Sequence, residues 1–407
     1  MDGREQRGLE IAATKKIRRM KNLWFVPSSN NSALYEVRLE GETKPCTCLD
    51  FETRQITCKH IHAVTFTLQR ETRPDGSVLE TRSVRVTYGQ NWTAYNAAQT
   101  HEKERVTELL RGLCDGIVQP AQKRGRPRLA LSDLVFSTTM KVYGLTSGRR
   151  AATDIRDCKT KGHIDHVPHY NSIGNALESP ALTPILKSLI EESASPLSGV
   201  ESDFAIDSSG FSTCTFVRWF DHKYGKMHTD RQWLKCHLMI GVKTHVVTSV
   251  EITGKEGSDF NQLPPLVEST AKRFDMAEVS ADKGYISNKS FEAITAVGAT
   301  PYIPFKSNTT GEGPELWRKM FHFYQFNRTE FLEKYHKRSN VESTFSMIKA
   351  KFGASVRSKK RVAQVNEILC KVLCHNLSVL VHSIYELGLE PTFWAEKTPA
   401  QKVDAIW

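Results

Sequence analysis

The chain has 407 residues, of which 39% are hydrophobic and 25% charged, a balance that predicts two or three folded domains with a sizeable core. The charged N-terminus and the lack of any run of about 18 apolar residues argue against a secretory signal and a membrane-spanning helix. Nine cysteines are an odd and small number for a disulfide scaffold, so we expect a cytoplasmic protein, and a net charge of +11 favours a polyanionic partner.

Residues 20–72 are predicted to form a small metal-binding module. Side chains alternate in character from Ala33 to Leu39, as they do in a strand. Cys46, Cys48, Cys58 and His60 follow, and three thiolates with one imidazole complete a tetrahedral structural zinc site. His62 competes with His60, and reduced thiols in a small core are the alternative. The pattern resembles the SWIM zinc finger, which implies a structural Zn²⁺ and a role in binding DNA or protein.

Residues 73–128 are predicted to be a connector that contains a helix from Thr100 to Leu113 and a basic linker. The linker sequence Lys123-Arg124-Gly125-Arg126-Pro127-Arg128 resembles an AT-hook. That resemblance implies that Arg124 and Arg126 enter a narrow A·T minor groove, where negative potential is concentrated. Non-specific contact between a basic linker and phosphates is an equally good interpretation.

Residues 129–197 have a helical pattern with short breaks, including a helix that starts at Thr183-Pro184. This segment also holds one cysteine and three histidines whose spacing matches no zinc module, so we expect them to be structural: Cys158, His163, His166 and His169.

From about residue 198 the pattern changes to strands alternating with helices, which indicates an α/β domain. A short apolar strand, Phe204 to Ile206, is expected to end at Asp207, and Ser208 to Gly210 to turn the chain. Further strands are expected at Trp233–Val242, His245–Ile252, Glu278–Asp282 and Pro301–Pro304, and helices at Leu263–Phe274, Ser290–Val297, Glu330–Lys351 and Val362–Leu387.

Three acids stand out in this domain. Asp207 and Asp282 end apolar strands, and ligands bind at the carboxyl ends of strands in an open α/β sheet. At about 100° per residue, Tyr335, Arg338, Glu342 and Lys349 fall within an arc of about 60° on the last expected helix before residue 352. Carboxylates suit Mg²⁺, and paired Mg²⁺ ions activate a nucleophile and stabilise the leaving oxygen in phosphodiester chemistry.

Taken singly, each aspartate could instead cap a helix or pair with a cation, and Asp203 and Asp230 compete for the first position. Asp203 is the weaker candidate because it precedes the apolar strand.

The segments around these acids, Phe204–Gly210, Ser280–Tyr285 and Tyr335–Glu342, resemble the catalytic motifs of DDE transposases of the insertion-sequence type with the Tyr-Arg-Glu-Lys signature. The resemblance implies a ribonuclease-H-like catalytic domain over residues 198–390, Mg²⁺ or Mn²⁺ bound by Asp207, Asp282 and Glu342, and transposon-end and target DNA as double-stranded substrates. It also implies that Tyr335, Arg338 and Lys349 hold the DNA backbone.

The same resemblance implies that the helical segment 129–197 binds the DNA ends, that residues 391–407 are a C-terminal tail, and that two copies or more assemble in a nucleoid-associated synaptic complex. No Gly-x-x-x-x-Gly-Lys loop occurs, so no ATP-driven step is expected. A nuclease without strand transfer, or a zinc-dependent DNA-binding regulator, are the alternative functions.

Two further groups of residues are candidate DNA contacts. The interval from Asp282 to Glu342 is longer than one helix and one strand require, and its surplus holds aromatic residues at 317, 321, 323, 324 and 326. We favour the interpretation that these aromatic side chains pack within an inserted element over the alternative that they stack on unpaired DNA bases. Arg231, Trp233, Lys235 and His237 alternate along one strand and could line a DNA channel.

Overall fold

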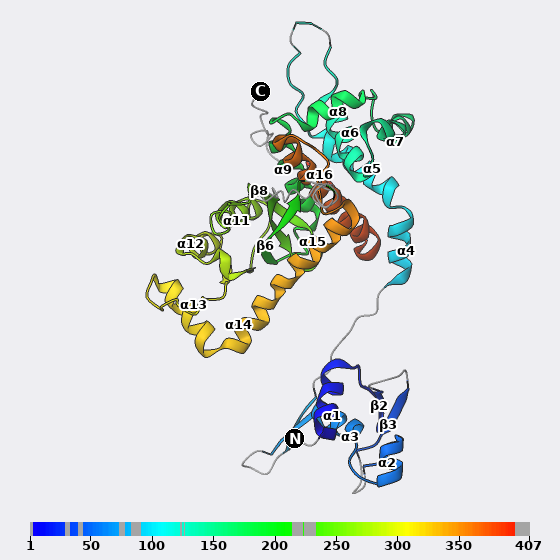
Figure 1. Cartoon of the computed structure of the whole chain (residues 1–407), viewed down its shortest axis with the longest axis vertical. Coiled ribbons are helices and arrows are strands. Elements are labelled where there is room, and N and C mark those ends of the chain that lie inside the picture. The colour runs from blue at the N-terminus through cyan, green and yellow to red at the C-terminus, as the bar shows by residue number, and fades with distance from the viewer. Residues whose placement is uncertain are drawn as a thin grey trace. The chain divides into compact units, whose positions relative to one another are not determined.

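The computed structural model describes residues 3–28, 33–39, 44–72, 78–82, 91–122, 124–125, 127–213, 223 and 233–394. The chain divides into two compact units, Met1–Gly89 and Gln90–Trp407. The first unit is drawn in blue shades in Figure 1, and the second runs from cyan to red.

The first unit is built on a three-stranded antiparallel sheet in the order β1-β2-β3. Its elements are α1 (Gly3–Thr14), β1 (Arg18–Met20), β2 (Leu23–Pro27), β3 (Leu34–Val37), α2 (Leu49–Arg54), α3 (Lys59–Thr67) and a separate hairpin of β4 (Leu68–Thr72) and β5 (Val78–Arg82). Helix α1 packs against α3 at Gly8, where a Cβ atom would lie 2.5 Å from the Cβ of His62. Only glycine permits this approach.

The second unit begins with helices, as the sequence predicted. They are α4 (Trp92–Thr100), α5 (Glu102–Asp115), α6 (Leu131–Tyr143), α7 (Gly148–Thr160), α8 (Tyr170–Leu177), α9 (Leu182–Ala194) and the short η1 (Ser195–Leu197). Pro184 lies in the first turn of α9, where its missing N–H has no intrahelical partner to lose.

A five-stranded mixed sheet follows, in the order β10-β9-β6-β7-β8. Its strands are β6 (Asp203–Ser212), β7 (Trp233–Gly241), β8 (Val247–Gly254), β9 (Glu278–Ala281) and β10 (Thr300–Tyr302), and α11 (Leu263–Ala271), η2 (Lys283–Tyr285) and α12 (Asn288–Ala296) connect them. Strands β6, β7 and β8 pair antiparallel, whereas β9 pairs parallel with both β6 and β10. The expected ribonuclease-H-like α/β domain is confirmed.

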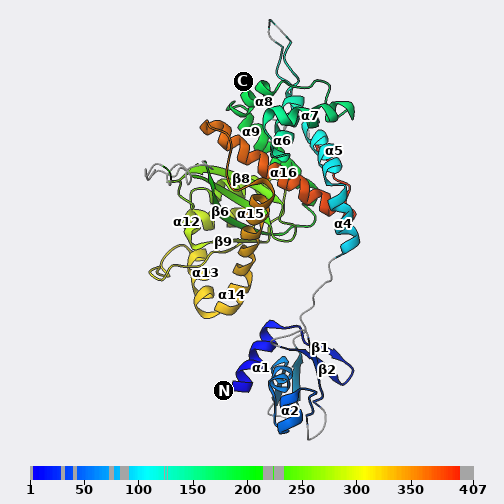
Figure 2. The same ribbon diagram turned by 45° about the vertical axis from the view of Figure 1, so that its right-hand side comes forward.

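The chain ends in helices α13 (Glu315–Phe326), α14 (Arg328–Tyr335), η3 (His336–Arg338), α15 (Ser339–Phe352) and α16 (Arg361–Leu387). Asn366 of α16 donates to the carbonyl of Leu177, and Asn376 of α16 exchanges hydrogen bonds with Val247 of β8. Helix α16 therefore holds the helical segment and the sheet together, as Figure 2 allows the reader to follow.

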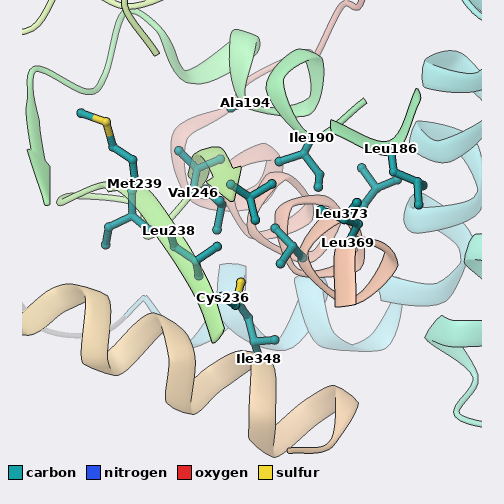
Figure 3. Packing of buried hydrophobic residues seen from close by; sticks show 14 of the residues in the cluster. Leu186, Ile190, Ala194, Cys236, Leu238, Met239, Val246, Ile348, Leu369 and Leu373 are labelled. Atoms are coloured by element: carbon teal, nitrogen blue, oxygen red, sulfur yellow. The ribbon is translucent and has the colours of Figure 1, made fainter. Parts of the chain in front are cut away.

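Helix α16 is also long and apolar enough to cross a membrane, but 83% of its most apolar window is buried inside the unit. Figure 3 shows part of this buried surface: Leu369 and Leu373 of α16 lie beside Leu186 of α9, with Ile190 of the same helix nearby. Ile348 of α15 lies beside Cys236 in the same cluster. Helix α16 is a core helix of this unit.

Two predicted element boundaries were wrong. Strand β6 does not end at Asp207 but continues to Ser212, because residues 207–212 keep pairing with β7 after their pairing with β9 has stopped. The expected single helix from Glu330 to Lys351 is divided by η3, three residues wound more tightly between α14 and α15.

Candidate active site and metal centre

Asp207 and Asp282 become neighbours through the register of the sheet. The parallel pairing of β6 with β9 ends at Ile206 and Ala281, so the next residue on each strand is one of the two aspartates. Asp207 remains in β6, opposite Leu238 of β7, while Asp282 precedes η2. Two carboxylates thus leave the sheet side by side at the point where β9 diverges from β6.

Glu342 reaches the same place from the first turn of α15. The guanidinium of Arg338 contacts two of the acids, with Nη1 2.5 Å from Asp207 Oδ2 and Nη2 2.7 Å from Glu342 Oε1. Burial raises the pKa of Asp207, and the charges of Asp282 and Glu342 raise it further against the opposing effects of the Ser208 N–H and Arg338. The three acids therefore share one electrostatic environment.

The remaining members of the Tyr-Arg-Glu-Lys set face this group. The hydroxyl of Tyr335 donates to Asp282 Oδ1 over 3.4 Å. Lys349 Nζ donates to Ser209 Oγ over 2.6 Å, two residues beyond Asp207, and burial lowers its pKa. The side chain of Glu342 is 60% exposed, so the group opens to solvent on the α15 side.

A polar network behind the aspartates includes His237 and Lys235, for which the strand pattern had suggested a DNA channel instead. His237 is fully buried, with Nδ1 3.1 Å from the Tyr285 hydroxyl and Nε2 3.0 Å from Thr253 Oγ1. Asp259 Oδ1 accepts from Ser208 Oγ over 3.3 Å and lies 2.5 Å from Lys235 Nζ. Tyr285 and Ser208 belong to the motifs around Asp282 and Asp207, but Asp259 lies in a loop where no pattern could have identified it.

Asp203, the competing first acid, pairs with Lys337 at 2.6 Å near the start of β6. It lies four residues before Asp207 on the strand, beside Glu278, which Lys337 also contacts. Asp230 lies outside the described residues.

Most of the aromatic side chains between Trp317 and Phe326 pack against other aromatic rings. Trp317, Phe321 and Tyr324 surround Phe305, with ring centroids 5.0 to 5.8 Å apart, and Phe323 packs on Phe331. Phe326 differs, since it is 80% exposed. On β7, Trp233 is exposed and Lys235 is half-buried, but His237 is buried under Tyr285, and Arg231 lies outside the described residues.

The four predicted zinc ligands form one buried cluster in the first unit. The ligand atoms of Cys46, Cys48, Cys58 and His60 lie within 4.8 Å of one another, the one such group among the described residues. His60 Nδ1 is 3.8 Å from Cys46 Sγ and 3.9 Å from Cys58 Sγ, close to the roughly 3.6 Å that separates nitrogen and sulfur ligands of one tetrahedral zinc ion. His62 is not part of the group and stacks on Phe66.

The donor set of this cluster fits a zinc ion. Contacts with the Cys46 thiol and with His60 lower the pKa of Cys58 to about 4, whereas the contact with Cys58 raises the pKa of Cys46 and burial raises that of Cys48. Thiolates are the form that binds metal. Three residues of the helical segment have structural roles instead: His163 stacks on Phe136, His169 caps α8, and Cys158 is buried.

In the basic linker, Arg124 is exposed. Arg126 and Lys123 lie outside the described residues, so the AT-hook-like sequence stays a prediction.

Two family models match the chain. Residues 198–377 match the transposase DDE domain, which covers the five-stranded sheet, the three acids and most of α16. Residues 35–69 match the SWIM zinc finger, which covers all four clustered ligands.

Proposed function

The chain carries a transposase DDE domain preceded by a SWIM zinc finger, and we propose that it binds the ends of a transposable element and catalyses metal-dependent cleavage and strand transfer of DNA. The observation that carries the proposal is the convergence of Asp207, Asp282 and Glu342, with Arg338 in contact with two of them.

The acids would hold divalent cations, Mg²⁺ or Mn²⁺. Their oxygens are hard donors, and the mutual repulsion that raises the pKa of Asp207 is what a bound cation would relieve. A divalent ion bound there would activate a water or a DNA 3′-hydroxyl and would stabilise the charge on the leaving oxygen. The family match supports the use of divalent metals, and the choice of Mg²⁺ is ours.

The chain's own residues would position the DNA. Tyr335, Arg338 and Lys349 lie around the acids, where a phenol and two cations can contact the phosphates that flank the reacting bond. Asp259, Lys235 and His237 would keep the segments after Asp207 and Asp282 in place through Ser208 and Tyr285.

DNA recognition would involve more of the chain. We propose that residues 129–197 bind the element's ends, that Arg124 and Arg126 contact DNA from the linker, and that the zinc-finger segment, residues 20–72, binds DNA or protein. The zinc ion would be held by Cys46, Cys48, Cys58 and His60. Synapsis of two ends requires at least two copies, acting in the nucleoid, and no step requires ATP.

The test is to incubate the full-length zinc-loaded protein with the DNA that flanks its own gene, plus Mg²⁺, and to sequence the junctions. Transposition predicts 3′-hydroxyl ends at the element's termini joined to new target sites. Nicked termini without joined products would support a nuclease instead, and intact DNA with tight binding would support a regulator.

A further inference from the structure

A small polar cavity lies in the second unit, away from the three acids. It has a volume of about 110 Å³, several times the roughly 30 Å³ that one water molecule occupies. Its walls come from the end of α6 and the turn after it, the end of α15, the loop from residue 353 to 360, and α16. The polar and charged side chains that line it are Lys141, Thr146, Ser355, Arg357, Glu367 and Lys371.

Lys371 is an ammonium group buried without an ion pair. The residue is 2% exposed, and Nζ donates to two backbone carbonyls, those of Gly353 and Ser355, over 2.9 and 2.7 Å. An ammonium has three N–H donors, so one has no acceptor among the described residues. Lys371 forms no ion pair within the part of the chain that the structure describes; burial lowers the pKa of Lys371 to about 8, and the charge of Glu367 opposes that shift.

The other groups around the cavity leave it positively charged. Glu367 is its one acid, and both of its oxygens already accept from the backbone N–H of Arg357, while Oε2 also accepts from Ser358. Lys141 and Arg357 add two cations. The hydroxyl of Thr146 is shielded from solvent and has no hydrogen-bond partner in the described structure.

Three cations, one engaged acid and an unpartnered hydroxyl around a partly open cavity form a site for an oxyanion. Arginine, lysine and hydroxyl donors together suit a phosphate group. We propose that this cavity, lined by Lys371, Arg357, Lys141 and Thr146, binds a phosphate group, and that its source is a DNA backbone phosphate.

The position of the cavity favours DNA as the source, a step that rests on the function proposed above. Helix α15 runs from the candidate active site at Glu342 to the cavity at Gly353, and eleven residues of helix span roughly 16 Å. Lys359 and Lys360 lie exposed on the same loop as Arg357. A duplex held over the acids could therefore place a second phosphate here.

The first arm of the test uses inorganic phosphate and the full-length zinc-loaded protein, titrated calorimetrically at constant ionic strength. Thr146→Val removes a hydroxyl that has no partner, so it costs no hydrogen bond of the fold, and Lys371→Met removes the buried charge. We expect each to weaken phosphate binding about tenfold or more. The matched control is Lys351→Met, since Lys351 is already paired with Glu102 and does not line the cavity.

The second arm measures duplex DNA affinity against salt without divalent metal, so cleavage plays no part. Because Lys371 is buried, a phosphate reaches it only through the cavity. Lys371→Met should reduce the salt slope by about 0.9 in magnitude, one phosphate contact, and Thr146→Val should weaken binding without changing that slope.

Phosphate binding that is lost in both variants, with an unchanged DNA slope, would assign the site to free phosphate instead of DNA. No phosphate binding by the native protein, or equal loss in Lys351→Met, would overturn the site. If the protein does not bind DNA at all, that result would count against the proposed function. The titration with inorganic phosphate would still decide whether the cavity binds phosphate.

Discussion

The guanidinium of Arg338 offsets much of the negative charge of the candidate site, because it contacts Asp207 and Glu342. Burial alone lowers the pKa of its guanidinium, but Tyr335, Asp207 and Glu342 together raise it above its ordinary value. Arginine suits this position because its planar group contacts two carboxylates at once, which the single ammonium of a lysine does not reproduce. Asp207 and Glu342, 135 positions apart in the sequence, are thereby held near one cation.

His60 and His62 differ by two positions, and the structure separates their roles. His60 Nδ1 faces the sulfurs of Cys46 and Cys58, whereas His62 stacks on Phe66. We expect His60→Ala to lower zinc affinity at least tenfold, because one of four ligands is lost. His62→Ala should keep native stoichiometry. Zinc measured by atomic absorption after dialysis against a competing chelator checks both, and equal loss in the two variants would reject His60 as the ligand.

Two buried histidines make the fold sensitive to acid. Burial lowers the pKa of His237 and of His375 to about 4, whereas an unfolded histidine titrates near 6.5. Between these values the unfolded chain binds more protons than the folded one, so stability is retained above about pH 6.5 and lost as pH falls toward about 4.

Each of these histidines should contribute a loss of up to about 1.4 kcal/mol per pH unit in that window. Urea unfolding at pH 7, 6 and 5 should show a shallower loss in His375→Gln than in the native protein. Glutamine can still donate to the carbonyl that His375 contacts, that of His245. An identical acid dependence in the two proteins would contradict the buried neutral state of His375.

At the level of elements, two glycines of the helices make a matched pair, one at the end of a helix and one inside a helix. Gly388 ends α16 in the left-handed region with φ +66°, and no atom lies within 4 Å of where its Cβ would be. Gly388→Ala should therefore cost about 1 kcal/mol through backbone strain alone. Gly174 lies inside α8 with equally open space, and Gly174→Ala should stabilise by roughly 0.5–1 kcal/mol. Shifts of the same sign in thermal unfolding would contradict this assignment.

The sequence predicted most elements, because strands and helices here follow strong apolar periodicity, as in Phe204–Ile206 and α16. The predicted boundaries were wrong where contacts with residues distant in the sequence determine the end of a strand or helix. The extension of β6 beyond Asp207 depends on pairing with β7, from Ser208 opposite His237 to Ser212 opposite Trp233, residues more than twenty positions later in the chain. In the η3 turn, Lys337 contacts Asp203 and Glu278 of the sheet, and no local pattern contains these contacts.

The same distinction holds for the site. Its acids and cations belong to motifs with fixed spacing, so Glu342 and Arg338 could be selected from the sequence. Asp259 could not, because its role depends on contacts with Ser208 and Lys235 that exist only in the folded chain, and the strand pattern suggested Lys235 only as a residue of a DNA channel. The phosphate cavity joins α6, α15 and α16 and is visible only in three dimensions.

At the scale of the whole molecule, the two compact units should respond separately to metal removal. The zinc cluster lies in Met1–Gly89, among the core residues Trp24, Val26 and Val37. Removing zinc leaves three buried sulfurs and an imidazole without their ligand, so we expect this unit to lose cooperative unfolding. The transition of Gln90–Trp407 should stay within about 2 °C, because its core is separate.

Scanning calorimetry with and without a zinc chelator resolves this. Cys58→Ser should reproduce the effect of the chelator, and Cys114→Ser, a buried cysteine of the second unit outside the cluster, should not affect the first. A second-unit transition that moves with zinc would show that the units are coupled.

The central proposal is that Asp207, Asp282 and Glu342 bind the divalent cations as one group, so that none of the three can be lost without loss of cleavage. The most direct test is the rate of Mg²⁺-dependent cleavage at the element's own terminal DNA by Asp207→Asn, Asp282→Asn and Glu342→Gln, with Asp203→Asn as the matched control. We predict a loss of at least about a thousandfold in each of the three with near-native DNA affinity, and native cleavage in the control. Native cleavage by any of the three, or its loss in Asp203→Asn alone, would contradict the assignment.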